Sequence, residues 1–226
     1  MFNNMLMGAA GESTKATGFA VDNSIVFNDD DSQYLIRENA SNSTTGGSDA
    51  RKKFTVSLWW KHGNINSGGQ NLFIQRNSSS NYLKCGIAGS GGNEGALQFF
   101  AGTLGAFNTG DTTAVLRDFH AWYHILFYYD STDSTAGDRA RIYLNGTRLT
   151  DFQSSTTNPS SGAITQFGSN NAQVINQQQG GSQYGDGYMA EMVVIDGQAL
   201  TPDNFTETDS NGVLRPLNIS SQNFTF

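Results

Sequence analysis

Apolar and polar residues alternate with a period of two along most of the chain, and helical periodicity is nearly absent. The clearest stretch is FTVSLWWKHG, residues 54 to 63. Because an extended strand sends successive side chains to opposite faces, this stretch predicts a half-buried strand. Its apolar face carries Phe54, Val56, Leu58 and Trp60, and its other face carries Thr55, Ser57, Trp59 and Lys61. Shorter runs bounded by Gly and Ser predict strands at 70–77, 81–89 and 96–102.

Three further segments extend this pattern. AWYHILFYYD (121–130) carries aromatic and branched residues on both faces, which predicts a central strand that is covered on both sides. RARIYLNGTRLTDF (139–152) places Asn145-Gly146 between apolar flanks, which favours a type I′ hairpin. SIVFNDDDSQYLIR (24–37) has two apolar runs around an Asn-Asp-Asp-Asp turn and predicts another hairpin.

The stretch MAEMVVIDGQALTP (189–202) predicts the last strand and its end. Alternation places Met189 and Ile195 on one face, and Asp196-Gly197 turns the chain. Thr201 is then a suitable cap for one short helical turn near 202–208, with Pro202 at its first position. A loop rich in Gly, Gln and Asn, from about 168 to 187, precedes the strand.

Short strands separated by turn residues predict an all-β fold, a two-sheet antiparallel β-sandwich of the jelly-roll kind. The chain has 226 residues, a length that sandwiches use for a single domain. We divide it into an apolar N-terminal docking arm (1–17), the jelly-roll sandwich (18–213) and a C-terminal tail (214–226).

Charge and composition narrow the classes of partner. Charged residues make up 15% of the chain and the net charge is −7, which argues against a nucleic-acid partner because phosphate binding needs clustered Lys and Arg. The one basic run, Arg51-Lys52-Lys53, is interpreted as the solvated start of a strand. Cys85 has no second cysteine for an internal disulfide, and we interpret it as a small buried residue.

The N-terminal segment MFNNMLMGAAGESTKATG is apolar but does not read as a signal peptide, since it lacks a basic n-region. No stretch of the sequence is long and apolar enough to insert into a membrane. The arm is either a disordered tail or a docking segment, and we favour docking. Burial would be worth about 1.5 to 3 kcal/mol for each large side chain, before ordering costs. Those side chains are Met1, Phe2, Met5, Leu6 and Met7.

Taken in order, the segments FTVSLWWKHG, WYHILFYYD, RIYLNGTRL and GYMAEMVVIDGQALTPDNF resemble the laminin-G-like, or concanavalin A-like, jelly-roll family. With MFNNMLMGAAG and NSIVFNDDDSQYL added, the chain resembles the version carried by tailed, especially marine, bacteriophages. The resemblance implies a virion structural protein at the particle surface, assembled in the host cytoplasm. It would be a capsid decoration or accessory subunit that contacts other virion proteins, and a homo-oligomer. The alternative is a glycan-binding adhesin of the tail or tail fibre that recognises host polysaccharide.

The sequence argues against an enzyme. Glycosidases on this fold resemble one another in having closely spaced carboxylates on one strand, two of which act about 5 Å apart. Glu191 is the sole carboxylate within 188–195, and alternation places Asp196 on the opposite face. His120 and His124 have a metal-ligand spacing that suits a helix, whereas His124 falls in a predicted strand.

Two kinds of binding residue remain, and no cofactor is required. Asp29 and Asp31 are candidate calcium ligands at a loop rim, and the alternative is a solvated turn. Trp59 is a candidate for stacking on a sugar ring, and the alternative is packing within the second layer of the sandwich. Tyr184 and Tyr188, beside the 168–187 loop, are further candidates for exposed glycan recognition.

Overall fold

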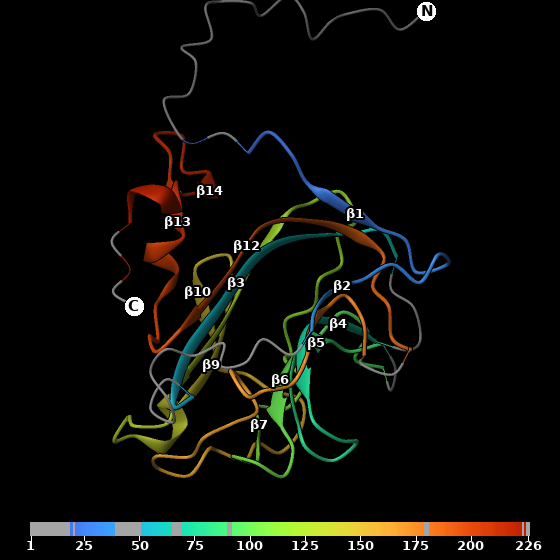
Figure 1. Cartoon of the computed structure of the whole chain (residues 1–226). Helices are drawn as coiled ribbons and strands as arrows, with labels where there is room; N and C mark the ends of the chain where they lie inside the picture. The colour runs from blue at the N-terminus through green and yellow to red at the C-terminus, as the bar shows by residue number, and fades with distance from the viewer. Residues whose placement is uncertain are drawn as a thin grey trace, which may run out of the picture.

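The computed structural model is a sandwich of two antiparallel six-stranded sheets (Figure 1). It describes residue 19 and residues 21–38, 51–64, 69–89, 92–178, 181–222 and 224. The docking arm predicted for residues 1–17 lies outside this part of the chain. No helix among the described residues has the length and hydropathy to cross a membrane.

The first sheet, called sheet A here, has the strand order β1-β12-β3-β8-β9-β10. Its strands are β1 (Ile25–Phe27), β12 (Gly187–Asp196), β3 (Lys53–His62), β8 (Tyr123–Asp130), β9 (Ala140–Leu144) and β10 (Thr147–Leu149). The second sheet, sheet B, has the order β2-β11-β4-β5-β6-β7. Its strands are β2 (Leu35–Arg37), β11 (Gln173–Ile175), β4 (Gln70–Arg76), β5 (Tyr82–Ile87), β6 (Leu97–Ala101) and β7 (Phe107–Asn108).

The remaining elements are short. A third sheet pairs β13 (Thr206–Thr208) with β14 (Leu214–Pro216), so the boundary that we predict after residue 213 falls inside this pair. The helical elements are single 3-10 turns, η1 (Ala136–Asp138), η2 (Pro202–Asn204) and η3 (Ile219–Ser221). The prediction of an all-β, two-sheet antiparallel sandwich is confirmed.

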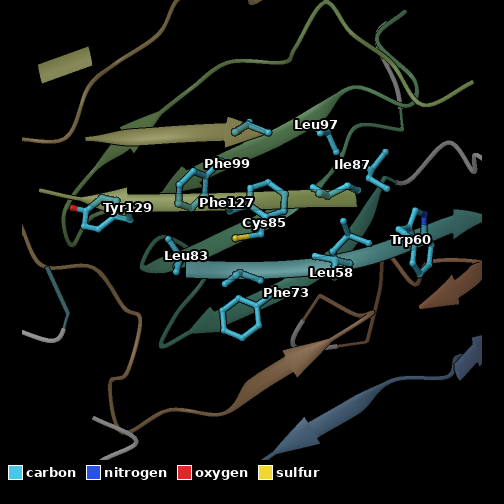
Figure 2. Close-up of a cluster of buried hydrophobic side chains, with 14 of the residues drawn as sticks. Leu58, Trp60, Phe73, Leu83, Cys85, Ile87, Leu97, Phe99, Phe127 and Tyr129 are labelled. Atoms are coloured by element: carbon cyan, nitrogen blue, oxygen red, sulfur yellow. The ribbon is translucent and has the colours of Figure 1, made fainter. Parts of the chain in front are cut away.

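The core lies between the two sheets and is rich in aromatic rings (Figure 2). The apolar face of β3 points into it as predicted, and Phe54 stacks on Phe167 with ring centres 4.2 Å apart. The opposite face of β3 is also covered, since Thr55 and Ser57 are fully buried. The expectation of a half-buried strand was therefore wrong, because the segment after β12 packs over this outer face of sheet A through Phe205.

The segment 24–37 does not form the predicted hairpin. β1 pairs with β12 in sheet A, whereas β2 pairs with β11 in sheet B. The turn between them carries the chain from one sheet to the other, and the Ser32 backbone N–H donates to the Asp29 carbonyl at 3.0 Å. The turn residues predict that the chain reverses its direction, but they do not show whether the two strands that follow and precede the turn join the same sheet. The prediction for 139–152 is confirmed, since Asn145 and Gly146 link β9 to β10 with φ of 49° and 81°.

A β-bulge interrupts the alternation predicted for the last long strand. Met189 lies opposite Trp60 on the core face of sheet A, whereas Ile195 lies opposite Thr55 on the outer face. The register shifts between Ala190 and Val193, where Glu191 has a φ of 46°. Because a bulge adds one residue to a strand, every side chain after it changes face. Asp196 is consequently on the core-facing side, opposite Phe54.

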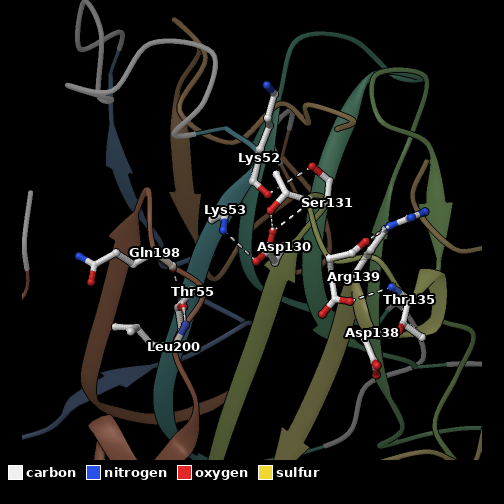
Figure 3. Close-up of polar contacts among 12 residues, drawn as sticks. Lys52, Lys53, Thr55, Asp130, Ser131, Thr135, Asp138, Arg139, Gln198 and Leu200 are labelled. Carbon is white, nitrogen blue, oxygen red and sulfur yellow. Dashed lines mark hydrogen bonds and ion pairs between the residues drawn. The ribbon is translucent and has the colours of Figure 1, made fainter. Parts of the chain in front are cut away.

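The helical turn predicted near 202–208 is present but shorter. It ends at Asn204, and Thr201 makes no side-chain capping bond. The loop before it is held instead by Thr55 of β3, whose Oγ1 donates to the Gln198 carbonyl at 3.0 Å and accepts from the Leu200 N–H at 2.7 Å (Figure 3). These bonds fix the path of the chain after β12 over sheet A.

Candidate functional site

A polar pocket opens on the outer face of sheet B, over β4, β5 and β6. It holds about 210 Å³ and is lined by Asn71, Ile74, Arg76, Ser79, Tyr82, Lys84, Phe100, Gln178 and Gln183. Strand residues supply its floor, and the loop between β11 and β12 supplies one wall through the two glutamines. The pocket therefore combines side chains from segments far apart in the sequence.

Strand alternation explains why Lys84 faces the pocket. Its neighbours Leu83 and Cys85 point into the core, so Lys84 points outward, between Ile74 of β4 and Phe100 of β6. The next outward position is Gly86, where a Cβ atom would lie 2.8 Å from Lys84 Cε. Glycine at this position leaves the space that the lysine stem occupies.

Lys84 is a buried cation. It is 9% exposed, and its ammonium lies 5.5 Å from the centre of the Phe100 ring. Burial lowers the pKa of Lys84 to about 8, and the charge of Asp111 partly offsets that effect. None of the ion pairs among the described residues involves Lys84. A desolvated ammonium beside a pocket is able to receive an oxygen ligand there.

Asn71 supplies a fully buried amide to the same pocket. Its Nδ2 donates to Gln183 Oε1 at 2.9 Å, while its Oδ1 has no hydrogen-bond partner among the described residues. Gln183 has a φ of 55°, an uncommon conformation for a residue with a side chain. A buried acceptor without a partner has a substantial free-energy cost, which a hydroxyl donor from a ligand or a water would relieve.

Aromatic side chains complete the pocket. Tyr82 and Phe100 meet edge to face, with ring centres 5.4 Å apart. No acidic residue is found among the described residues that line the pocket. The pocket can therefore bind polar groups and pack against C–H surfaces, but it lacks the carboxylate pair that glycoside hydrolysis requires.

A second groove, of about 390 Å³, lies on the outer face of sheet A. Trp59 and Trp122 line it, together with Asp22 and Arg215 from the segments that precede β1 and form β14. Trp59 is 8% exposed and its ring lies 5.4 Å from that of His124, so most of its surface is used in packing. Trp122 is more open, at 38% exposed.

The predicted glycan residues do not converge on one site. Trp59 and Tyr188 share the outer face of sheet A, where Tyr188 is 42% exposed and Lys61 lies 5.8 Å from its ring centre. Tyr184 accepts a hydrogen bond from Gln177 Nε2 at 2.7 Å. Lys84 is not among the site residues predicted from the sequence, although a single lysine within the apolar stretch YLKCGI is a signal that points to it.

The candidate calcium residues lie in the turn between β1 and β2. Asp31 Oδ2 accepts from Asn28 Nδ2 at 3.1 Å, as in a hydrogen-bonded turn. The pKa of Asp186 is raised by burial and by the nearby charges of Asp29 and Asp30. The described residues contain no group of three or more His, Cys, Asp or Glu placed to hold a metal ion. Calcium at Asp29 and Asp31 stays a prediction, and backbone carbonyls or waters would have to supply most of its ligands.

Comparison with known proteins identifies the fold. Residues 25–204 match the family model Laminin_G_3, the concanavalin A-like lectin/glucanases superfamily. No curated protein matches the chain at a significant level.

Solved structures share the fold at low identity. Domain 4 of AbnA, an extracellular arabinanase from Geobacillus stearothermophilus, in complex with arabinotriose, is 16% identical with a TM-score of 0.51, covering 80% of this chain and 73% of that one. A Bacteroides ovatus protein provisionally described as carbohydrate binding is 14% identical with a TM-score of 0.52, covering 82% of this chain and 59% of that one. With most of its length matched, the chain belongs to the concanavalin A-like lectin/glucanases superfamily.

Proposed function

We propose that this protein is a non-enzymatic carbohydrate-binding module that holds a saccharide in the sheet B pocket. The observation that carries the proposal is that two polar side chains and two aromatic rings line one pocket. The Asn71 Oδ1 acceptor lacks a hydrogen-bond partner among the described residues, the Lys84 ammonium takes part in none of the ion pairs found there, and Tyr82 and Phe100 line the same pocket. A sugar ring offers hydroxyl groups to the first pair and C–H faces to the second.

The fold supports the same ligand class by analogy. The superfamily unites lectins with glucanases, and the arabinanase domain of the same fold is in complex with arabinotriose. Because a fold hosts many functions, the analogy adds to the proposal without carrying it. The absence of acidic side chains among the described lining residues supports binding without hydrolysis.

The test is a binding screen of the purified chain against immobilised oligosaccharides, followed by calorimetry on any that bind. Tyr82→Ala should weaken binding at least about tenfold, which corresponds to loss of a ring contact of about 1.4 kcal/mol. Trp122→Ala, in the groove on the other sheet, is the matched control and should bind like the wild type. The reverse result would move the site to sheet A, and binding of no saccharide would refute the function.

A second candidate function, attachment to a larger assembly, is favoured by an exposed apolar strip. Edge strands β1 and β2 and the end of β12 expose Ile25, Val26, Leu35, Ile36 and Val194. A largely apolar cleft of about 570 Å³ lies between the two sheet edges, lined in part by Ile25, Leu35 and Val194. Exposed apolar strips beside unpaired strand edges are common docking surfaces.

We infer from the sequence resemblance that this assembly is a phage particle, with the domain as a decoration subunit or as a tail adhesin. Ile25→Asp with Leu35→Asp should reduce incorporation into particles if the strip is the contact. Deletion of residues 1–17 tests the arm separately. Unchanged incorporation in both variants would exclude attachment through either element, and calorimetry on the same variants would show whether saccharide binding persists.

A further inference from the structure

Lys84 has no counter-ion in the described part of the protein, although its ammonium is largely desolvated. The charge of Asp111 raises the Lys84 pKa, but Asp111 forms no ion pair with Lys84, and both of its carboxylate oxygens accept hydrogen bonds from amide groups. Oδ1 accepts from Gln98 Nε2 at 2.7 Å and Oδ2 accepts from Asn93 Nδ2 at 2.8 Å. A buried cation without an ion pair is costly, and the cost falls when an anion enters beside it.

The charged side chains that line the pocket are both cationic. Arg76 lines the same pocket, and its Nε donates to the Ser78 carbonyl at 3.0 Å, which holds the guanidinium at the pocket wall. The lining therefore contains two cationic side chains and no acidic one among the described residues. This local balance is opposite to that of the whole chain, which carries a net charge of −7. An acidic protein that collects two cations in one polar pocket creates a local site for an anionic group.

We propose that the pocket selects saccharides that carry a carboxylate, such as uronic or ulosonic acids, and that Lys84 pairs with this carboxylate. The inference rests on the proposed function and deepens it by naming the ligand class. Asn71 lines the same pocket, and a small shift of its buried amide would let Oδ1, which has no partner among the described residues, accept a hydrogen bond from a neighbouring hydroxyl of the same sugar. Gly86 keeps this arrangement open, because a Cβ atom there would lie 2.6 Å from the Gln70 carbonyl oxygen and 2.8 Å from Lys84 Cε.

The Lys84 pKa of about 8 gives the proposal a pH signature. The ammonium must be protonated to pair with a carboxylate, so the affinity for acidic saccharides is highest below pH 8. Above that value the free protein loses the proton, and affinity falls by up to about tenfold for each pH unit until the pKa of the complex is reached. The other charged or titratable groups around the pocket are Arg76, Tyr82 and Asp111.

The experiment measures calorimetric affinity of the full chain for a panel of uronic-acid and ulosonic-acid oligosaccharides, each paired with its carboxyl-reduced counterpart. The acids should bind at least about tenfold more tightly than the reduced sugars. Lys84→Met should remove that difference and abolish the fall in affinity above pH 8. Lys61→Met, on the outer face of sheet A, is the matched control and should keep both.

The possible results distinguish a preference for carboxylated saccharides from carbohydrate binding in general. Equal affinity for acids and reduced sugars would overturn the inference while leaving carbohydrate binding intact. Binding of neither kind would overturn both. If Lys84→Met does not fold, the pH profile of the wild type decides, because an affinity that stays constant from pH 7 to pH 10 excludes a titrating lysine at the carboxylate.

Discussion

Ser57 Oγ lies 2.9 Å from His124 Nε2, and both side chains are buried between sheet A and the layer that covers it. Burial lowers the pKa of His124 to about 4, and the same cause lowers that of His62, in the same sheet, to about 4. Both histidines are therefore neutral in the folded protein at neutral pH. Because burial disfavours the charged imidazole, protonation of either histidine favours the unfolded chain over the folded one.

The first prediction is loss of stability in mild acid. When folding lowers a histidine pKa, the unfolded chain binds more protons than the folded chain between the two pKa values. The free energy of unfolding is therefore highest above pH 6.5 and falls as the pH drops toward 4. The free energy of unfolding should decrease by about 1.4 kcal/mol per pH unit for each histidine in this range. Denaturant titrations at pH 7, 6, 5 and 4 measure the slope.

Variants assign the slope to the buried pair. Ser57→Ala with His124→Phe removes one titrating imidazole together with its hydroxyl partner, and roughly half of the histidine contribution to the slope should disappear. Ser57→Ala alone keeps the imidazole and should keep the slope. A double variant with the wild-type slope would show that His124 does not titrate in this range.

The sequence pattern predicted most strands because alternation reports which side chains an extended strand sends to each face. It failed where backbone geometry intervened. The bulge beside Glu191 moved Ile195 to the outer face, and no residue type marks that position. The short strand β11 lies within the segment predicted as a loop, because its three residues are ordered by pairing with β2 and β4 on either side.

The candidate site was harder to predict than the fold. Alternation places Lys84 on an outer face but does not say whether that face is open, covered or hollow. The pocket depends on Gln183, which lies 112 residues after Asn71 and reaches it only through tertiary structure. Trp59 shows the opposite error. Its outward position in the strand made it a candidate for stacking on a sugar, but the segments that cover sheet A leave it largely buried.

The second prediction concerns the hairpin between β9 and β10. Gly146 has a φ of 81° and nothing lies within 4 Å of the place where its Cβ would be. Gly146→Ala should therefore cost about 1 kcal/mol through backbone strain alone. Gly137→Ala is the matched control, because its site is equally open and its φ is not in the positive range. Thermal unfolding of both variants measures the difference, and equal melting temperatures would contradict the strain argument.

The third prediction tests the anchor between β3 and the loop after β12. Thr55→Val keeps the shape of the side chain but removes the hydroxyl that serves Gln198 and Leu200 (Figure 3). The Leu200 N–H and the Gln198 carbonyl then lose these partners, which should cost about 1 to 3 kcal/mol. Thr55→Ser keeps the hydroxyl and should cost less. The order of the two variants in urea denaturation is the measurement, and a more stable valine variant would contradict the assigned role.

The fourth prediction concerns the aromatic core. The Phe54 ring stacks between Phe167 at 4.2 Å and Tyr129 at 4.9 Å, measured between ring centres, so it joins the β3–β8 pair to a loop of the opposite layer. Phe54→Ala should cost about 3 to 5 kcal/mol because the cavity cannot close between two rings held by their own strands and loops. Phe54→Leu fills most of that volume and should cost less than half as much.

Val213, which is exposed, provides the control, since Val213→Ala should change stability by no more than about 0.5 kcal/mol. Equal effects at Phe54 and Val213 would mean that the loop carrying Phe167 moves to fill the space, and a hydrogen-exchange measurement on residues 163–168 would then show faster exchange in Phe54→Ala.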